Sequence, residues 1–147
     1  MTTNKIPLSA PKLSDNELIY IEGALSKSWV SNAGPTITLF ENRIADYVGL
    51  TVALAVQSGT AGLHLSLLSI GLKPNEIVLV PSLTFTVSIN SVLYVGAELV
   101  FLDVDDSLCN SSQPLDQFID SQCKWDGRTL SLASTNQKIS GLIYFHV

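Results

Sequence analysis

The stretch from residue 53 to residue 71 constrains the fold of this chain more than any other. Small apolar residues lead into the polar turn Gln57-Ser58-Gly59-Thr60, and leucine-rich sequence of helical length follows. A strand that turns directly into a helix leaves the first backbone N–H groups of the helix unpaired. With the helix dipole, these groups can bind an anion such as phosphate. Gly59 would allow a ligand to approach closely, and Ser58 or Thr60 could cap the helix. The alternative is an ordinary N-cap turn without a ligand.

Short apolar runs alternate with helical patterns along the rest of the chain. We expect strands at residues 52–56, 77–80, 99–102 and 141–145, and helices at 14–27, 36–48, 60–72, 84–95 and 114–123. The helix at 60–72 is apolar on nearly every side, which predicts that it is buried. Residues 124–138 are expected to form a polar insertion or loop. Strands that lack polar alternation are covered on both faces, so the pattern predicts an α/β fold with a mainly parallel sheet in α/β/α layers.

Three local signals set the predicted helix ends in the first third of the chain. Ser14 and Glu17 have the spacing of a capping box, which predicts a helix that starts at Ser14. The pair Gly34-Pro35 predicts a loop between two helices. Gly49 is the expected C-cap of the second helix.

Composition excludes several classes of function. The chain has 147 residues, of which 46% are hydrophobic and 14% charged, and its net charge is −5. This composition is unusually apolar and indicates either a piece of a larger protein or a domain whose surface is partly covered by a partner. Without a basic cluster, nucleic acid is not an expected partner, and no stretch is long enough to span a membrane. Two widely spaced cysteines, Cys109 and Cys123, and the absence of a signal-peptide pattern predict reduced thiols and a cytoplasmic protein.

Three segments should meet at the carboxyl edge of the predicted sheet, where ligands bind in open α/β folds. They are residues 58–61, 81–86 and 103–105. Phe85 could face a bound planar ring there, or it could be an ordinary core phenylalanine. Asp103 and Asp105 could bind a metal, but they are expected to cap the turn, so no metal site is predicted.

Neither histidine is expected to be a catalyst. His64 falls one turn after Thr60 in an apolar helix, where a histidine is usually a satisfied core residue. His146 follows the last predicted strand at the ligand edge, one residue before the end of the sequence given.

Several segments together resemble one family. IPLSAPKLSDNE, SWVSNAGP, FENRIADYVG, the run at 52–105 and IYFHV have the order and spacing of the DegT/DnrJ/EryC1/StrS aminotransferases, which are sugar-nucleotide aminotransferases of the fold-type I pyridoxal phosphate class. The loop at 29–34 and the insertion around CKWDG look most like the LegC-type subgroup. That subgroup aminates 4-keto-6-deoxy amino sugars for nonulosonic acids or related surface glycans. Residues 1–14, marked by Pro7 and Pro11, are expected to be extended. The resemblance implies the first part of the large domain at 15–147, with the C-terminal domain absent.

The resemblance also implies which residues bind the cofactor, pyridoxal 5′-phosphate. Gly59, Thr60 and Ala61 would hold its phosphate, at the turn that the helix-terminus argument had already singled out. Phe85 would stack on the pyridine ring, where relatives carry phenylalanine, tyrosine or tryptophan.

Substrate contacts are implied in the loop that contains Trp29, Ser31 and Gly34, which would approach the sugar nucleotide. Trp29 could instead be an anchor for that loop. The family implies glutamate as the amino-group donor and a homodimer with its active site at the subunit interface.

One departure from the family bears on activity. The family's Schiff-base lysine, and the aspartate that pairs with the pyridine nitrogen, lie downstream of the segment matched by IYFHV. The chain contains six lysines, none of them in a matching motif: Lys5, Lys12, Lys27, Lys73, Lys124 and Lys138. An amine nucleophile and an acid partner are required by the chemistry. We therefore expect the N-terminal part of an aminotransferase, inactive alone and without catalytic residues. The alternative is an inactive remnant or stub.

Overall fold

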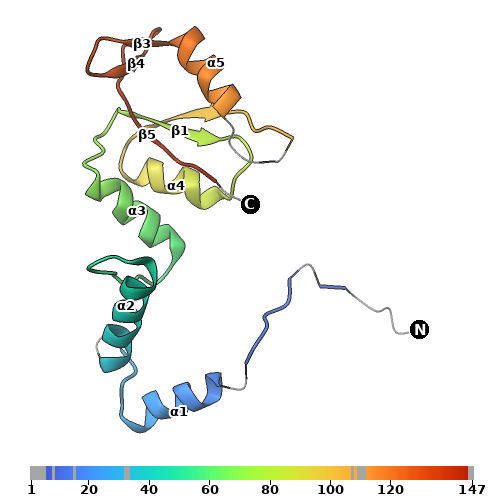
Figure 1. Cartoon of the computed structure of the whole chain (residues 1–147), viewed down its shortest axis with the longest axis vertical. Helices are drawn as coiled ribbons and strands as arrows, with labels where there is room; N and C mark the ends of the chain where they lie inside the picture. The colour runs from blue at the N-terminus through green and yellow to red at the C-terminus, as the bar shows by residue number, and fades with distance from the viewer. Residues whose placement is uncertain are drawn as a thin grey trace. The chain divides into compact units, whose positions relative to one another are not determined.

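The structure is a computed structural model that describes residues 6–7, 9–14, 16–31, 34–106, 108 and 112–145. The chain divides into two compact units, Met1–Ala55 and Val56–Val147. Figure 1 shows helices in the first unit, and a sheet with helices around it in the second. Each unit is described by itself below.

The first helix of unit Met1–Ala55, α1, spans Glu17–Ser26, and its N-cap is Asn16 rather than the predicted Ser14. Ser14 does contact Glu17, but as a donor: its backbone N–H and its hydroxyl both bond to Glu17 Oε1, at 2.7 and 3.0 Å. Only the glutamate half of the capping box therefore forms. The bond from the Ser14 N–H lowers the pKa of the Glu17 carboxyl.

The second helix, α2, spans Pro35–Val48 and follows the predicted Gly34-Pro35 loop. The predicted C-cap is confirmed, because Gly49 has the left-handed φ of 72°. Its N–H donates to the Asp46 carbonyl at 3.3 Å, and the Leu50 N–H donates to the Ala45 carbonyl at 2.9 Å. This pair of bonds is a Schellman motif, which ends the helix and reverses the chain toward residues 52–56.

A parallel three-stranded sheet forms the centre of unit Val56–Val147. Its order is β2-β1-β5, with β1 at Ile77–Pro81, β2 at Glu98–Leu102 and β5 at Ile139–Leu142. Both strand pairs are parallel, as predicted. Helices α3 (Gly59–Ser69) and α4 (Thr86–Tyr94) pack on one face, and α5 (Ser112–Gln122) packs on the other. The predicted α/β/α layering is therefore confirmed within this unit (Figure 1).

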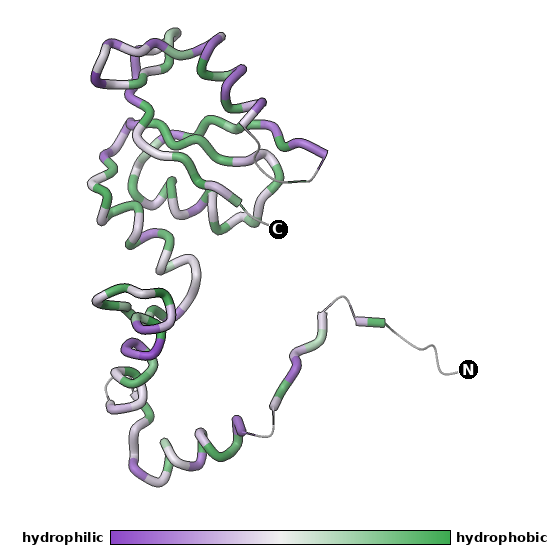
Figure 2. The backbone as a smooth tube through the Cα atoms, viewed as in Figure 1, coloured by the Kyte–Doolittle hydropathy of each residue, from purple (hydrophilic) through white to green (hydrophobic). Residues whose placement is uncertain are grey.

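Strand β1 joins the two cores, and all five of its residues are buried. Val78 and Val80 belong to the cluster with α3 and α4, whereas Ile77 and Leu79 belong to the cluster with α5. The first four residues of the strand, 77–80, are coloured as hydrophobic in Figure 2. Full burial of each such side chain contributes about 1.5–3 kcal/mol to stability.

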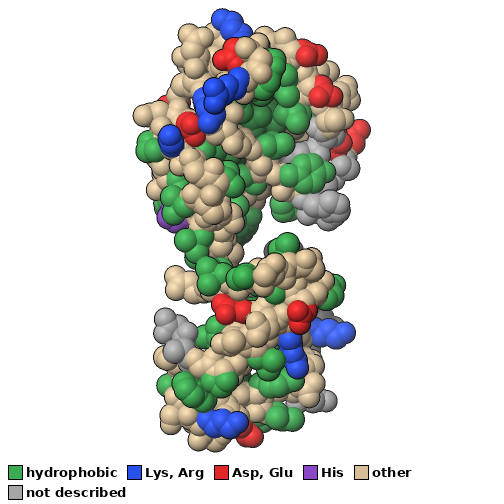
Figure 3. All heavy atoms as spheres, turned by 60° about the vertical axis from the view of Figure 1, so that its left-hand side comes forward, with side chains coloured by type: hydrophobic (Ala, Val, Ile, Leu, Met, Phe, Trp, Pro, Cys, Tyr) green, Lys and Arg blue, Asp and Glu red, His purple; other side chains and the backbone are tan. Residues whose placement is uncertain are grey.

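Two predictions about the strand-turn-helix segment are wrong. Residues 52–56 form no strand, because a strand requires a hydrogen-bonded neighbour and the described residues supply none. Helix α3 is also less buried than predicted. Only Leu67 is buried, while Leu65 and Leu68 are 44% and 50% exposed, because α3 packs on α4 through one side only. Figure 3 shows apolar side chains at the surface of both units.

The predicted polar loop at 124–138 instead contains a hairpin. Strand β3 (Cys123–Trp125) pairs antiparallel with β4 (Leu130–Leu132). In the turn between them, Asp126 Oδ1 accepts the N–H groups of Arg128 and Thr129 at 2.8 and 2.7 Å. These two bonds, the one from Thr129 first, lower the pKa of Asp126.

Candidate functional site

The amino-terminal turn of α3 is capped as the sequence predicted. Ser58, the N-cap, has extended backbone angles (φ −162°, ψ 159°), and its Oγ accepts the Ala61 N–H at 3.2 Å. The Ser58 carbonyl accepts the Gly62 N–H at 3.0 Å. Among the hydrogen bonds of the described residues, none uses the N–H of Gly59 or Thr60. Two donors at the positive end of the helix dipole therefore have no partner within the part of the chain that the structure describes.

Space beside these donors is open. A Cβ placed on Gly59 would meet no atom within 4 Å, apart from those of its chain neighbours and of the backbone of its own helix. Thr60 is half-buried at the next position. The geometry suits a small anion at the Gly59 and Thr60 N–H groups, while the Ala61 N–H is already used by the cap.

The carboxyl ends of the three strands lie together, as expected. The Ser82 N–H donates to the Leu102 carbonyl at 2.7 Å, and the Ile143 N–H donates to the Leu79 carbonyl at 2.9 Å. Helix α4 begins just beyond β1, and α3 leads into the start of β1 and packs beside α4. Both helices therefore begin toward the carboxyl edge of the sheet, the usual ligand edge of such folds.

Phe85 lies at this edge as the N-cap of α4, and its carbonyl accepts the Ser88 N–H at 3.0 Å. Its side chain is 77% exposed. The alternative of a core phenylalanine is thus wrong in this structure. An aromatic ring left in solvent at a ligand edge is available to a planar partner.

The other candidates of the sequence have local structural roles. His64 makes an edge-to-face contact with Tyr94, with ring centroids 5.6 Å apart. Asp103 Oδ1 accepts the Val104 N–H at 2.9 Å and the Ser82 hydroxyl at 3.4 Å, which is the expected role in the turn. The described part of the chain holds no cluster of three or more histidine, cysteine or acidic residues that could bind a metal. His146 lies outside the described residues.

The predicted substrate loop belongs to the unit Met1–Ala55, whereas the Ser58 turn and Phe85 belong to Val56–Val147. A Cβ on Gly34, whose φ is +142°, would lie 2.9 Å from Trp29 Cε3. The indole therefore packs directly against the glycine backbone, and the Trp29 N–H also donates to the Ala24 carbonyl at 3.0 Å. These contacts give Trp29 the role of loop anchor, although its side chain remains 44% exposed. Ser31 is exposed.

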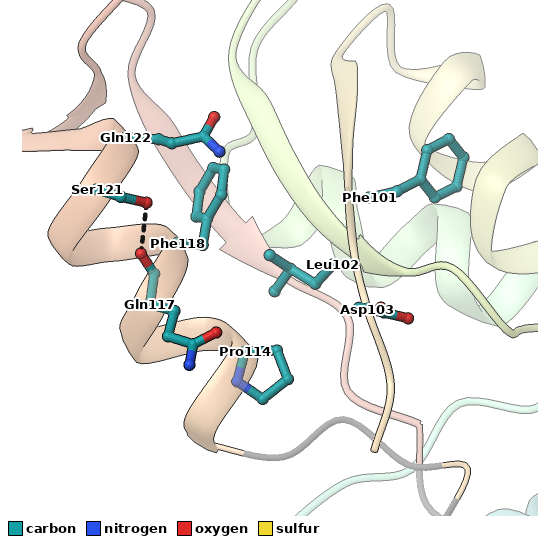
Figure 4. Close-up of a pocket in the computed structure, with 8 residues that line it drawn as sticks. All are labelled: Phe101, Leu102, Asp103, Pro114, Gln117, Phe118, Ser121 and Gln122. Carbon is teal, nitrogen blue, oxygen red and sulfur yellow. Dashed lines mark hydrogen bonds between the residues drawn. The ribbon is translucent and has the colours of Figure 1, made fainter. Parts of the chain in front are cut away.

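A shallow pocket of about 270 Å³ between β2 and α5 was not predicted. In Figure 4, Leu102 and Phe118 face one another across it, while Phe101 points away, and the Ser121 hydroxyl donates to the Gln117 carbonyl at 2.6 Å. Asp103 is the one ionisable side chain among the lining residues, so the pocket lacks the groups needed for acid–base or nucleophilic catalysis. Its lining residues are Phe101, Leu102, Asp103, Pro114, Gln117, Phe118, Ser121 and Gln122.

Two further groups with displaced pKa values lie away from the carboxyl edge. A hydrogen bond from the Lys73 N–H lowers the pKa of Glu76, near the start of β1, and the Lys138 ammonium at 3.2 Å adds to this shift. Burial raises the pKa of the Cys123 thiol in the hairpin. Neither group lies at the Ser58 turn, where the available donors are backbone N–H groups at the start of α3.

Comparison with known families identifies the fold. The profile of the DegT/DnrJ/EryC1/StrS aminotransferase family matches residues 11–124. The chain belongs to this family. The match includes the Ser58 turn and Phe85, so both lie within the family domain. The described residues contain no helix long and apolar enough to cross a membrane.

Individual relatives agree with this assignment. The GDP-perosamine synthase of Caulobacter vibrioides is 42% identical over 72% of this chain and 29% of its own length. A family member from Brucella abortus superposes with a TM-score of 0.72 at 27% identity, over 86% of this chain and 32% of that one. A Streptococcus pneumoniae protein described as a sugar aminotransferase, solved in PLP and PMP forms, superposes with a TM-score of 0.66 at 28% identity, over 76% of this chain. It is covered over 29% of its length in the PLP form and 28% in the PMP form, so the chain spans about a third of these relatives or less.

Proposed function

We propose that this chain supplies the phosphate-binding part of a pyridoxal phosphate-dependent aminotransferase. The complete enzyme would transfer an amino group from glutamate to a 4-keto-6-deoxy sugar nucleotide. The observation that carries the proposal is the capped start of α3, where the Gly59 and Thr60 N–H groups have no partner among the described residues. The PLP and PMP forms of the Streptococcus pneumoniae relative support the choice of cofactor.

The described residues fit this cofactor at both ends. The Gly59 and Thr60 N–H groups would donate to the phosphate, and the Ser58 cap would hold them in place through its bond to the Ala61 N–H. Phe85, 77% exposed at the same edge, would lie against the pyridine ring. When bound, the cofactor supplies the aldehyde carbon to which the amino group is transferred, and the ring that accepts electrons.

The substrate is proposed from the family and from the loop at 29–34. The name of the Caulobacter relative, GDP-perosamine synthase, favours a nucleotide-linked amino sugar as product. A role in nonulosonic-acid or surface-polysaccharide synthesis is a finer prediction, which rests on the resemblance to the LegC-type subgroup. In this proposal Trp29 and Gly34 shape the loop, and Ser31 contributes a polar group toward the sugar nucleotide. A homodimeric complete enzyme and a cytoplasmic location belong to the same proposal.

The chain alone is proposed to bind the cofactor without catalysing transamination. None of its lysines lies in a motif that matches the family's cofactor-attaching lysine, so no side chain is assigned to the proton transfer. An inactive remnant that retains the phosphate cradle is the second candidate. The absent lysine motif favours it as much as it favours a separated piece of an enzyme.

A binding and trapping experiment tests the proposal. The purified chain is titrated with pyridoxamine phosphate, which cannot attach to lysines, and with pyridoxamine as the control without phosphate. We expect saturable binding of the phosphate ester alone. Borohydride reduction in the presence of pyridoxal phosphate should label no single lysine preferentially, and glutamate with a GDP-linked 4-keto-6-deoxy sugar should give no amino sugar. Equal binding of the two probes would contradict the phosphate cradle, and turnover or one specifically labelled lysine would contradict the inactivity of the chain.

A further inference from the structure

Helix α4 begins with an unusual residue. Its N-cap is Phe85, whose side chain forms no cap hydrogen bond with the helix. Serine, threonine, aspartate and asparagine are preferred at this position, and a threonine stands on either side of Phe85, at positions 84 and 86. The phenyl ring is 77% exposed, so burial does not explain the choice either. A residue that breaks both local preferences is typical of a functional site.

A pair of hydroxyl groups lies across this start of the helix. Thr84 Oγ1 and Ser88 Oγ are 3.0 Å apart, so one hydroxyl donates to the other. Ser88 is 7% exposed, and its N–H also donates to the Phe85 carbonyl at 3.0 Å. One turn later in α4, Val92 is fully buried in the cluster shared with β1. Ser88 therefore lies on a helix that the core holds in place.

These two contacts restrain the Phe85 backbone from both sides. The bond to the Phe85 carbonyl holds the peptide group that follows this residue, and the bond to the Thr84 hydroxyl holds the residue that precedes it. Together they favour the observed backbone angles of Phe85, φ −74° and ψ 142°. Because the backbone on both sides determines the direction of the Cα–Cβ bond, the contacts also set the direction in which the exposed side chain leaves the chain.

We propose that Thr84 is a positioning residue for the Phe85 ring. It acts through Ser88 and the backbone of Phe85, and it needs no contact of its own with the ligand. A backbone that is restrained before binding loses less entropy when a planar ligand stacks on the ring. All of these residues, and the Ser58 turn, belong to the unit Val56–Val147. The inference rests on the proposed function for the identity of the ligand, but not for the effect of Thr84 on Phe85.

Substitutions in the full chain test the inference with two probes. Pyridoxamine phosphate presents a ring and a phosphate group, whereas inorganic phosphate presents no ring. Thr84→Val removes the hydroxyl, Thr84→Ser keeps it, and Thr86→Val makes the same change at the exposed threonine on the other side of Phe85. We expect Thr84→Val to bind pyridoxamine phosphate about two- to tenfold more weakly, and to bind inorganic phosphate as tightly as the unmodified chain. Thr84→Ser and Thr86→Val should match the unmodified chain with both probes.

Two further measurements show whether the effect passes through the ring. In a Phe85→Ala background, Thr84→Val should cause no further loss of pyridoxamine phosphate affinity. The three-bond NMR coupling that reports the φ angle of Phe85 should move toward an averaged value in Thr84→Val. Ser88→Ala removes the other hydroxyl of the pair and should reproduce both effects, so it replaces Thr84→Val if that variant does not fold.

The outcomes separate the inference from the proposed function. Equal weakening of both probes by Thr84→Val would make the hydroxyl pair a general stabiliser of the unit and overturn the positioning role, as would the same loss in Thr86→Val. An unchanged Phe85 coupling in Thr84→Val would also overturn it. If the unmodified chain does not bind pyridoxamine phosphate, the proposed function is wrong, and the Phe85 coupling alone then decides the inference.

Discussion

Replacing Gly59 by proline would remove one of the two backbone N–H groups proposed to bind phosphate, while leaving α3 intact. Gly59 is the first residue of α3, where proline is well tolerated because its missing N–H has no partner inside the helix. The preceding Ser58 has φ −162° and ψ 159°, the extended conformation that a residue before proline adopts. A Cβ at position 59 meets nothing within 4 Å beyond its chain neighbours and the backbone of its own helix, so the Cβ of proline fits there.

The expected effect is on binding rather than on stability. A hydrogen bond to a charged group contributes about 1.5–3 kcal/mol, so its loss should weaken binding of pyridoxamine phosphate about ten- to hundredfold. The same substitution restricts the unfolded chain, so the free energy of unfolding should be unchanged or rise by up to about 1 kcal/mol. Calorimetric titration measures the first quantity, and urea denaturation measures the second.

Gly59→Ala is the matched control, because it keeps the N–H and adds only a Cβ into open space. It should bind pyridoxamine phosphate within a few fold of the unmodified chain. The reasoning would be refuted if Gly59→Pro, with its fold intact, bound the ligand as tightly as Gly59→Ala.

Three further substitutions test the packing and the electrostatics of the two units. Gly34→Ala should disorder the loop at 29–34 and change the Trp29 fluorescence, because the new Cβ would lie 2.9 Å from the indole at a φ of +142°; an unchanged spectrum would contradict the packing. Ile77 lies in β1, is 1% exposed and belongs to the cluster with α5, so Ile77→Ala should lower the free energy of unfolding by about 2–5 kcal/mol in urea denaturation. The lowered pKa of Glu76, caused first by the Lys73 N–H, means that its stabilising effect is complete above the ordinary value of 4.5 and is lost as the pH falls through the lower folded value. Glu76→Gln should therefore lose less stability on acidification, and parallel acid-unfolding curves would contradict that assignment.

The sequence correctly predicted one fully buried strand and two helix caps. Residues 77–80 are apolar without alternation, and β1 indeed contributes side chains to both cores. Ser58 was one of two expected caps, and its hydroxyl accepts the Ala61 N–H as the spacing required. Gly49 ends α2 in the left-handed conformation that its position predicted. The signals at Ser58 and Gly49 succeed because each cap makes its stabilising contact within a few residues.

The errors have different physical causes. Residues 52–56 have the composition of a strand, but no described strand pairs with them. Among their described backbone groups, the Ala55 N–H is hydrogen-bonded, and its acceptor is the Glu41 carboxylate. The hairpin at 123–132 was not predicted, because its strands are short and partly polar. Its signal was the pair Asp126-Gly127 between two alternating segments, which is a hairpin pattern. The exposure of Phe85 could not be predicted, since spacing alone does not distinguish a core ring from a ligand-facing one.

The amide resonances of the chain during titration with pyridoxamine phosphate test the central claim most directly. The account predicts that the Gly59 and Thr60 amides shift first and furthest and that those around Phe85 follow. It also predicts that the Ala61 amide, already bonded to Ser58, moves less. Pyridoxamine without phosphate should leave the Gly59 and Thr60 amides unchanged. Shifts that bypass the start of α3, or that are the same with both probes, would contradict a phosphate-binding turn in this chain.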